Sequence, residues 1–163
     1  NIKSFLQKLP LVVDKTSFNT LDSFHHWDSQ LYKDTFCSFV YETWSISPNI
    51  VFYSEKIYKC ILNFHPFVAW ANPHTIKYMN DNGYKSFNPH INEDYDNHVS
   101  AEDRSILAMK EMVTLCDMTN TQLLDWYANQ EEILTHNYNR FMEEDSFMKS
   151  VNQFLEVYDR VVG

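Results

Sequence analysis

Glycine is almost absent from this chain of 163 residues, which contains only Gly83 and Gly163. Dinucleotide-binding and P-loop proteins use glycine-rich loops to bring the backbone close to a phosphate. Two isolated glycines exclude both kinds of loop. Any phosphate bound by this protein must therefore be held by a helix N-terminus and by side chains.

The chain also lacks a basic cluster, a long apolar run and a cysteine framework. Its formal net charge is −9, and binding of bulk nucleic acid requires a Lys/Arg patch, so such binding is not expected. No apolar run approaches the length of about 18 residues that suggests a membrane span, and no signal peptide is visible, so membrane insertion is not expected. Cys37, Cys60 and Cys116 are odd in number and far apart, which indicates reduced thiols of an intracellular protein.

Residue patterns typical of metal sites are also missing. His25 and His26 are adjacent and point to different sides of any regular element, and no Cys/His pair has zinc spacing. Asp94-Tyr95-Asp96 could hold Mg²⁺ or Mn²⁺ on a diphosphate. The tripeptide is common, however, and its acidic surroundings favour a solvated turn before the next helix. We therefore expect no metal and no bound cofactor.

Alternating segments in the middle of the chain predict a small α/β unit. Four segments have the apolar, β-branched and aromatic content of strands: residues 36–44, 50–53, 67–70 and 84–87. Helices are expected over residues 54–64 and 74–82, the second ending at Gly83 as a left-handed C-cap. This alternation implies a parallel sheet with right-handed crossovers.

The two ends of the chain differ in character. Residues 1–35 give no clear pattern, whereas the C-terminal half has helical periodicity over residues 101–117, 121–144 and 146–161. We predict one domain over residues 1–163, with a nucleotide-binding-like core at 36–88 and a helical half at 100–163. The expected fold class is α/β, with a short parallel Rossmann-like sheet of three to four strands followed by a mostly helical C-terminal half.

The most informative stretch is Ser54-Glu55-Lys56, where an apolar run stops and an amphipathic helix begins. Ser54 is a good helix N-cap, which places Glu55 and Lys56 in the first turn. That end of a helix has unpaired N–H groups and a partial positive charge, so a lysine there is unfavourable for helix stability alone. A phosphate bound at Lys56 would account for it. The alternative is an ordinary capped helix with a solvated first turn.

Two further charged residues enter this prediction. Lys59 lies one turn after Lys56, so both ammonium groups could face one anion. Equally, Lys59 could pair with Glu55, four residues earlier on the helix. Glu42 ends an otherwise apolar strand, and its pattern alone favours an edge position that reaches water.

Several short motifs follow one another between residues 36 and 140. They are Val40-Tyr41-Glu42-Thr43, Phe52-Tyr53-Ser54-Glu55-Lys56, Pro66-Phe67-Val68, Asn82-Gly83-Tyr84-Lys85-Ser86-Phe87, Glu93-Asp94-Tyr95-Asp96 and His136-Asn137-Tyr138. Their order resembles a family of phage-encoded glycosyltransferase-like proteins. The Ser/Thr-Glu-Lys turn of that family is similar to the donor-binding turn of fucosyltransferases and exostosin-like enzymes.

The resemblance implies the C-terminal Rossmann-like half of a GT-B enzyme. In the better-known relatives the acidic residue of the turn contacts the donor ribose and the basic residue contacts the pyrophosphate. Carried over by motif, Glu55 takes the ribose and Lys56 the phosphates, while Ser54 caps the helix. Glu42 then faces the same crevice, in agreement with the rule that ligands lie outside the carboxyl ends of parallel strands. The implied reaction is metal-independent, with Lys56 stabilising the leaving diphosphate.

The chain departs from this family in two places. A complete GT-B enzyme has a second, N-terminal Rossmann half, which residues 1–35 cannot supply, and Ala71-Asn72 stands where relatives usually have glycine. No catalytic base is identifiable, although a neutral His136 near a cleft could serve as one.

Two functions are therefore expected. The first is a glycosyltransferase-like domain that binds a nucleotide-sugar donor, in phage DNA or host-surface modification, and lies in the host cytoplasm. The alternative is a non-catalytic nucleotide- or protein-binding module that keeps only the fold and acts with a protein partner or a missing N-terminal domain.

Overall fold

The computed structural model describes residues 29–47 and 49–143. Along these ranges the elements are α2 (Ser29–Lys33), β1 (Ser38–Tyr41), α3 (Glu55–Leu62), β2 (Phe67–Trp70), α4 (Thr75–Asp81), the 3₁₀ helix η1 (Glu93–Asn97), α5 (Ala101–Cys116), α6 (Asn120–Ala128) and α7 (Glu131–Glu143). The fold is mixed α/β with a helical C-terminal half, as predicted. No helix in the described ranges is long and apolar enough to cross a membrane.

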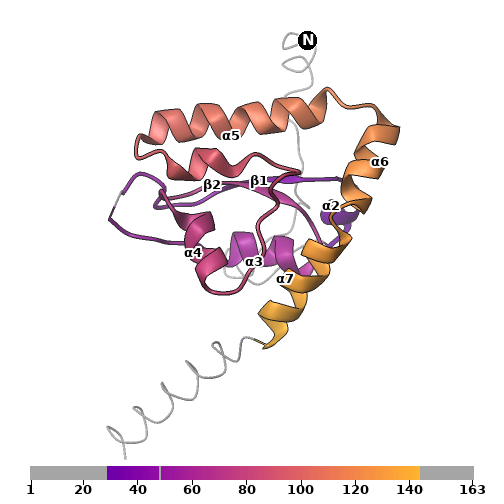
Figure 1. Cartoon of the computed structure of the whole chain (residues 1–163), viewed down its shortest axis with the longest axis horizontal. Coiled ribbons are helices and arrows are strands. Elements are labelled where there is room, and N and C mark those ends of the chain that lie inside the picture. Colours follow the sequence, from indigo (N-terminus) through magenta and orange to yellow (C-terminus); the bar gives the residue numbers. More distant parts are fainter. Residues whose placement is uncertain (1–28, 48, 144–163) are drawn as a thin grey trace, which may run out of the picture.

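The centre of the fold is a parallel pair of strands, in which Ser38 of β1 lies opposite Phe67 of β2. Figure 1 shows α5 on one side of this sheet and α3 with α7 on the other. The core is formed where these layers meet, since Val68 of β2, Ile57 of α3 and Ala108 of α5 are all fully buried. The sheet therefore has apolar contacts on both faces, as expected for parallel strands.

Helix α3 begins and ends where local sequence signals place it. The Ser54 side chain accepts a hydrogen bond from the Lys56 N–H, as an N-cap residue does. Ile57, Cys60 and Ile61 are buried and lie on one face at i, i+3 and i+4 spacing. Pro66, a few residues after the helix, cannot continue it.

Helix α4 ends close to its predicted limit. Gly83 follows it with a φ of +91°, a conformation that side chains rarely adopt. A Cβ at this position would also meet the Arg140 Nε at 2.9 Å. The glycine is therefore required both by the backbone turn and by the approach of α7.

Two of the four predicted strands are absent from the described part of the chain. Residues 50–53 and 84–87 have no regular secondary structure, and in each segment a buried asparagine takes backbone hydrogen bonds that a neighbouring strand would otherwise take. The Phe52 N–H donates to the Asn72 Oδ1 at 3.2 Å. The Asn137 amide bonds both the N–H and the carbonyl oxygen of Lys85, at 2.7 and 2.9 Å. The described sheet therefore has two strands rather than three or four.

The outer edge of β2 is closed by a side chain as well. The Ala69 N–H, which points away from β1, donates to the hydroxyl oxygen of Tyr95 at 3.2 Å. Tyr95 is itself buried, on η1. A third strand beyond β2 would have to displace this aromatic side chain from the core.

The prediction of a solvated turn at Asp94-Tyr95-Asp96 is wrong. Tyr95 and Asp96 are buried in η1. The Asp96 carboxylate accepts the Lys77 N–H at 3.0 Å, and the Asp96 carbonyl oxygen accepts the His74 N–H at 2.8 Å. The N-cap residue of α4, His74, makes no capping bond with its own side chain. Asp96 therefore caps α4 from a distant segment, a role that a carboxylate fills well at a helix N-terminus.

The C-terminal half also differs from the periodicity in one place. The single helix predicted over residues 121–144 is divided, with α6 ending at Ala128 and α7 beginning at Glu131. Thr119 and Gln122 form a capping box that starts α6. The helix predicted over residues 146–161 and most of the ambiguous segment 1–35 lie outside the described residues.

Glu93 is a buried carboxyl group beside η1. It accepts hydrogen bonds from the Ser86 hydroxyl and from the Phe87 N–H. Burial raises the pKa of this carboxyl above the usual range of a glutamate, against the effect of these two donors. The native protein therefore binds a proton here at pH values where the unfolded chain has released it.

This difference predicts a pH dependence of stability. As the pH rises above about 4.3, the ordinary pKa of glutamate, the free energy of unfolding contributed by Glu93 falls until the native carboxyl has also ionised. We expect the neutral, isosteric Glu93→Gln variant to flatten this slope. Urea titrations of both proteins between about pH 4 and pH 7 measure it. Burial also raises the pKa of Asp96, so part of the slope stays in the variant. Parallel profiles for the two proteins would contradict the prediction.

Candidate functional site

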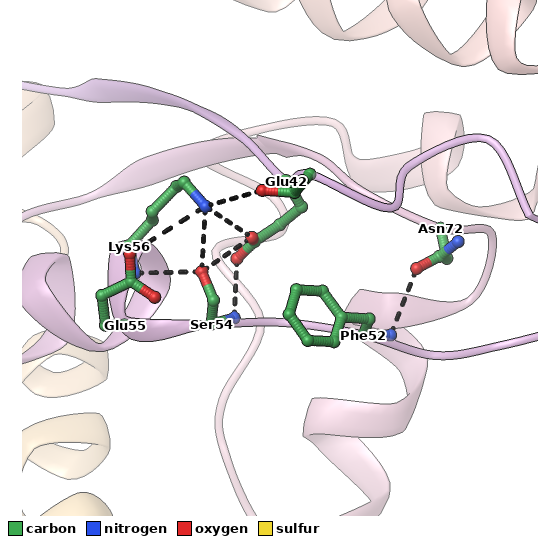
Figure 2. Close-up of polar contacts among 7 residues, drawn as sticks. Glu42, Phe52, Ser54, Glu55, Lys56 and Asn72 are labelled. Atoms are coloured by element: carbon green, nitrogen blue, oxygen red, sulfur yellow. Dashed lines mark hydrogen bonds and ion pairs between the residues drawn. The ribbon is translucent and has the colours of Figure 1, made fainter. Parts of the chain in front are cut away.

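Charged side chains meet at the carboxyl end of β1. Glu42 directly follows this strand, and Figure 2 shows its carboxylate directed toward the start of α3. The Ser54 N–H donates to the Glu42 Oε1 and the Ser54 hydroxyl donates to the Oε2, both at 2.8 Å. Glu42 is fully buried. The expectation that Glu42 reaches water at an edge is therefore wrong, because these donors hold its carboxylate inside the protein.

Lys56 completes this cluster. Its Nζ lies 3.4 Å from the Glu42 Oε2, 3.3 Å from the Ser54 Oγ, 3.3 Å from the Thr43 Oγ1 and 4.0 Å from a Glu55 carboxylate oxygen. The Lys56 side chain is 38% exposed. The Glu42 carboxylate thus offsets the unfavourable position of a cation at the positive end of α3. The Lys56 side chain nevertheless keeps contact with solvent.

The structure brings together most of the predicted site residues, but not Lys59. Glu55 lies at the exposed rim, where its carboxylate approaches Lys56 rather than Lys59. In the part of the chain that the structure describes, Lys59 makes no ion pair. The candidate site therefore consists of Glu42, Ser54, Glu55 and Lys56, and we call these four residues the α3 cluster.

Two buried polar residues beside the α3 cluster were missed by sequence reasoning. Asn72 follows β2 and bonds the loop before α3. Arg104 of α5 is 1% exposed and donates to backbone carbonyl oxygens of Ser45, Ala71, His98 and Val99. The position of Asn72 after a buried strand was a usable signal, since ligands and their supports gather there. Arg104 gave none, because arginine is usually found on the surface.

The chemistry available to the α3 cluster is that of anion recognition. The first turn of α3 supplies backbone N–H groups and the positive end of the helix dipole. Lys56 supplies an ammonium group on a partly exposed side chain, and Glu55 supplies an exposed carboxylate that can accept hydrogen bonds from hydroxyl groups. The cluster holds two carboxylates and one ammonium, so its formal charge is −1 and the charge of Lys56 is offset before any anion binds. In the described ranges, no group of three or more His, Cys, Asp or Glu residues could hold a metal ion.

His136 lies elsewhere. It borders a surface hollow of about 480 Å³ at the start of α7, whose lining includes no residue of the α3 cluster. The His136 Nε2 is 2.8 Å from the Gly83 carbonyl oxygen, so this nitrogen carries the proton and donates it. We therefore assign His136 a role in holding the end of α4 rather than that of a base at the α3 cluster.

Comparisons of the chain with protein-family models, with curated proteins and with solved structures found no match. What the protein does is therefore inferred from the geometry of the α3 cluster and from the motifs described above.

Proposed function

We propose that the chain is a glycosyltransferase-like domain that binds a nucleotide-sugar donor at the N-terminus of α3. The observation that supports this most is the contact between Glu42 and Lys56. A fully buried carboxylate at the end of a parallel strand orients a half-exposed lysine at the positive end of a helix. Ser54 already caps α3, so the helix does not need this pair. Burying the Glu42 carboxylate is costly unless it is fully hydrogen-bonded, so its position calls for a role beyond capping the helix.

Each residue of the α3 cluster then has a separate role. Lys56 and the first N–H groups of α3 bind the diphosphate, and Glu55 accepts hydrogen bonds from the ribose. Glu42 does not contact the ligand but orients Lys56 and Ser54. As the glycosidic bond breaks, Lys56 stabilises the charge that develops on the leaving diphosphate, so no metal is needed. A cytoplasmic, phage-derived protein belongs to the same proposal.

A specific observation favours the second candidate function. Lys56 already has a carboxylate partner at 3.4 Å and another at 4.0 Å, so its charge is offset without a ligand. If Lys56 binds no ligand, the α3 cluster is a structural latch, which means that its ion pair and hydrogen bonds only hold α3 against the end of β1. The chain is then a non-catalytic module that acts through a protein partner or a second domain.

Ligand-induced stabilisation distinguishes the two candidates. We expect one nucleoside diphosphate, or its sugar, to raise the free energy of unfolding by about 2.7 kcal/mol at 100 times its dissociation constant. Thermal-shift assays followed by calorimetry measure this. Lys56→Ala should lose the stabilisation, because the diphosphate loses its ammonium partner.

Lys77→Ala is the matched control for this experiment. Lys77 is an exposed lysine that pairs with Asp81 on α4 and takes no part in the α3 cluster. This variant should keep the full ligand response. If no nucleotide stabilises the wild-type protein, the donor site is wrong and the latch is the better account. If a sugar nucleotide does bind, an assay for the release of nucleoside diphosphate from it distinguishes a protein that only binds the donor from one that also turns it over.

A further inference from the structure

Asn72 holds the loop between β1 and α3 at three points. Its Oδ1 accepts the Phe52 N–H at 3.2 Å, and its Nδ2 donates to the carbonyl oxygens of Trp44 and Ser47 at 2.5 and 2.6 Å. Asn72 is fully buried. Figure 2 shows its bond to Phe52 beside the α3 cluster. We call residues 43–47 and 49–53, which connect Glu42 to Ser54, the site loop.

The chemistry of these three bonds requires an asparagine. The position needs one acceptor and two donors on a short side chain, and the opposite orientation of the amide would set its oxygen against two carbonyl oxygens. The backbone of Asn72 is also fixed, because its carbonyl oxygen accepts the Thr75 hydroxyl at 2.8 Å. The side chain is therefore an anchored support at the end of β2.

Apart from Tyr53, whose ring packs against Tyr58 and Tyr78, the site loop has little apolar burial to hold it in place. Trp44, Ile46 and Ile50 are 60%, 71% and 50% exposed. Hydrophobic contacts that fix most loops to a core are therefore small here, and buried polar side chains supply the restraint instead. Asn72 bonds this loop near both of its ends, two residues after Glu42 and two residues before Ser54.

We propose that Asn72 is a positioning residue for the α3 cluster. It fixes the conformation of the site loop and thereby places Ser54 and the first turn of α3 against Glu42. The effect on ligand affinity rests on the proposed function, whereas the effect on the loop does not.

Hydrogen exchange measures the effect on the loop. We expect Asn72→Ala to speed exchange of the Phe52 and Ser54 amides about tenfold or more, because local opening of the loop then costs less free energy. Asn137→Ala is the matched control. Asn137 is a buried asparagine that bonds the backbone of Lys85 in another segment, so this variant should speed exchange at Lys85 and leave Phe52 and Ser54 unchanged.

Nucleotide affinity provides the second measurement. Using the nucleoside diphosphate that stabilises the wild type most, we expect Asn72→Ala to raise the dissociation constant about tenfold and Asn137→Ala to change it less than about twofold. If Asn72→Ala does not fold, Asn72→Ser, a small neutral polar side chain that cannot reach all three partners, replaces it. Unchanged exchange at Phe52 and Ser54 would overturn the positioning role. Faster exchange with unchanged affinity would overturn its link to the ligand. Failure of every nucleotide to bind the wild type would refute the donor site, while the exchange result would still decide the role of Asn72.

Discussion

We expect Arg104→Met to lower the free energy of unfolding by about 3–5 kcal/mol. The Arg104 guanidinium is almost completely buried and donates to four backbone carbonyl oxygens, at distances from 2.5 to 3.1 Å. These oxygens belong to the turn after β1, the end of β2 and the segment before α5. Methionine fills similar volume but donates no hydrogen bond. Each orphaned buried carbonyl costs about 1–3 kcal/mol, and local relaxation recovers part of the sum.

Two controls make this prediction specific. Arg104→Lys keeps the charge but cannot reproduce the planar fork of donors, so it should recover less than half of the loss. Lys110→Met replaces an exposed cation on the same helix and should change stability by no more than about 0.5 kcal/mol. Urea denaturation of the three variants measures these differences. A loss smaller than about 1 kcal/mol in Arg104→Met would show that the four carbonyl groups find other partners.

The second large effect is expected at Glu42. Glu42→Ala removes the acceptor of the Ser54 N–H and hydroxyl group, and it removes the carboxylate partner of Lys56. We expect a loss of about 2–3 kcal/mol. The loss is below that of a fully buried ion pair, because Lys56 is 38% exposed and water can solvate its ammonium once the partner is gone.

A double-mutant cycle with Lys56→Ala divides this loss between its causes. The coupling energy between Glu42 and Lys56 should be about 0.5–1.5 kcal/mol, and the remainder belongs to the Ser54 bonds. Glu42→Gln should lose less than Glu42→Ala, since the amide oxygen still accepts one bond. The contradicting result is a coupling energy near zero, which would mean that Lys56 is oriented by Ser54 and Thr43 instead.

Local signals in the sequence were sufficient for several elements. The Ser54 cap predicted the start of α3, Gly83 predicted the end of α4, and the apolar run at 67–70 predicted β2. Each of these depends on groups within a few residues of one another, such as a hydroxyl and the N–H two positions later. For the same reason the grouping of Ser54, Glu55 and Lys56 followed from the sequence.

The tertiary structure decided which polar groups satisfy the backbone and where the charges are buried. Residues 50–53 and 84–87 are apolar enough for strands, but the Phe52 and Lys85 N–H groups donate to Asn72 and Asn137, which lie 20 and 52 residues further along the chain. Periodicity reports that a segment is buried, but not whether a strand or a side chain takes its hydrogen bonds.

The same separation applies to the α3 cluster. By itself, the sequence determined that a lysine stands at the positive end of α3. That a buried Glu42 orients this lysine was decided only by the fold, because β1 and α3 must pack together before a carboxylate 12 residues from Ser54 can replace water as its partner.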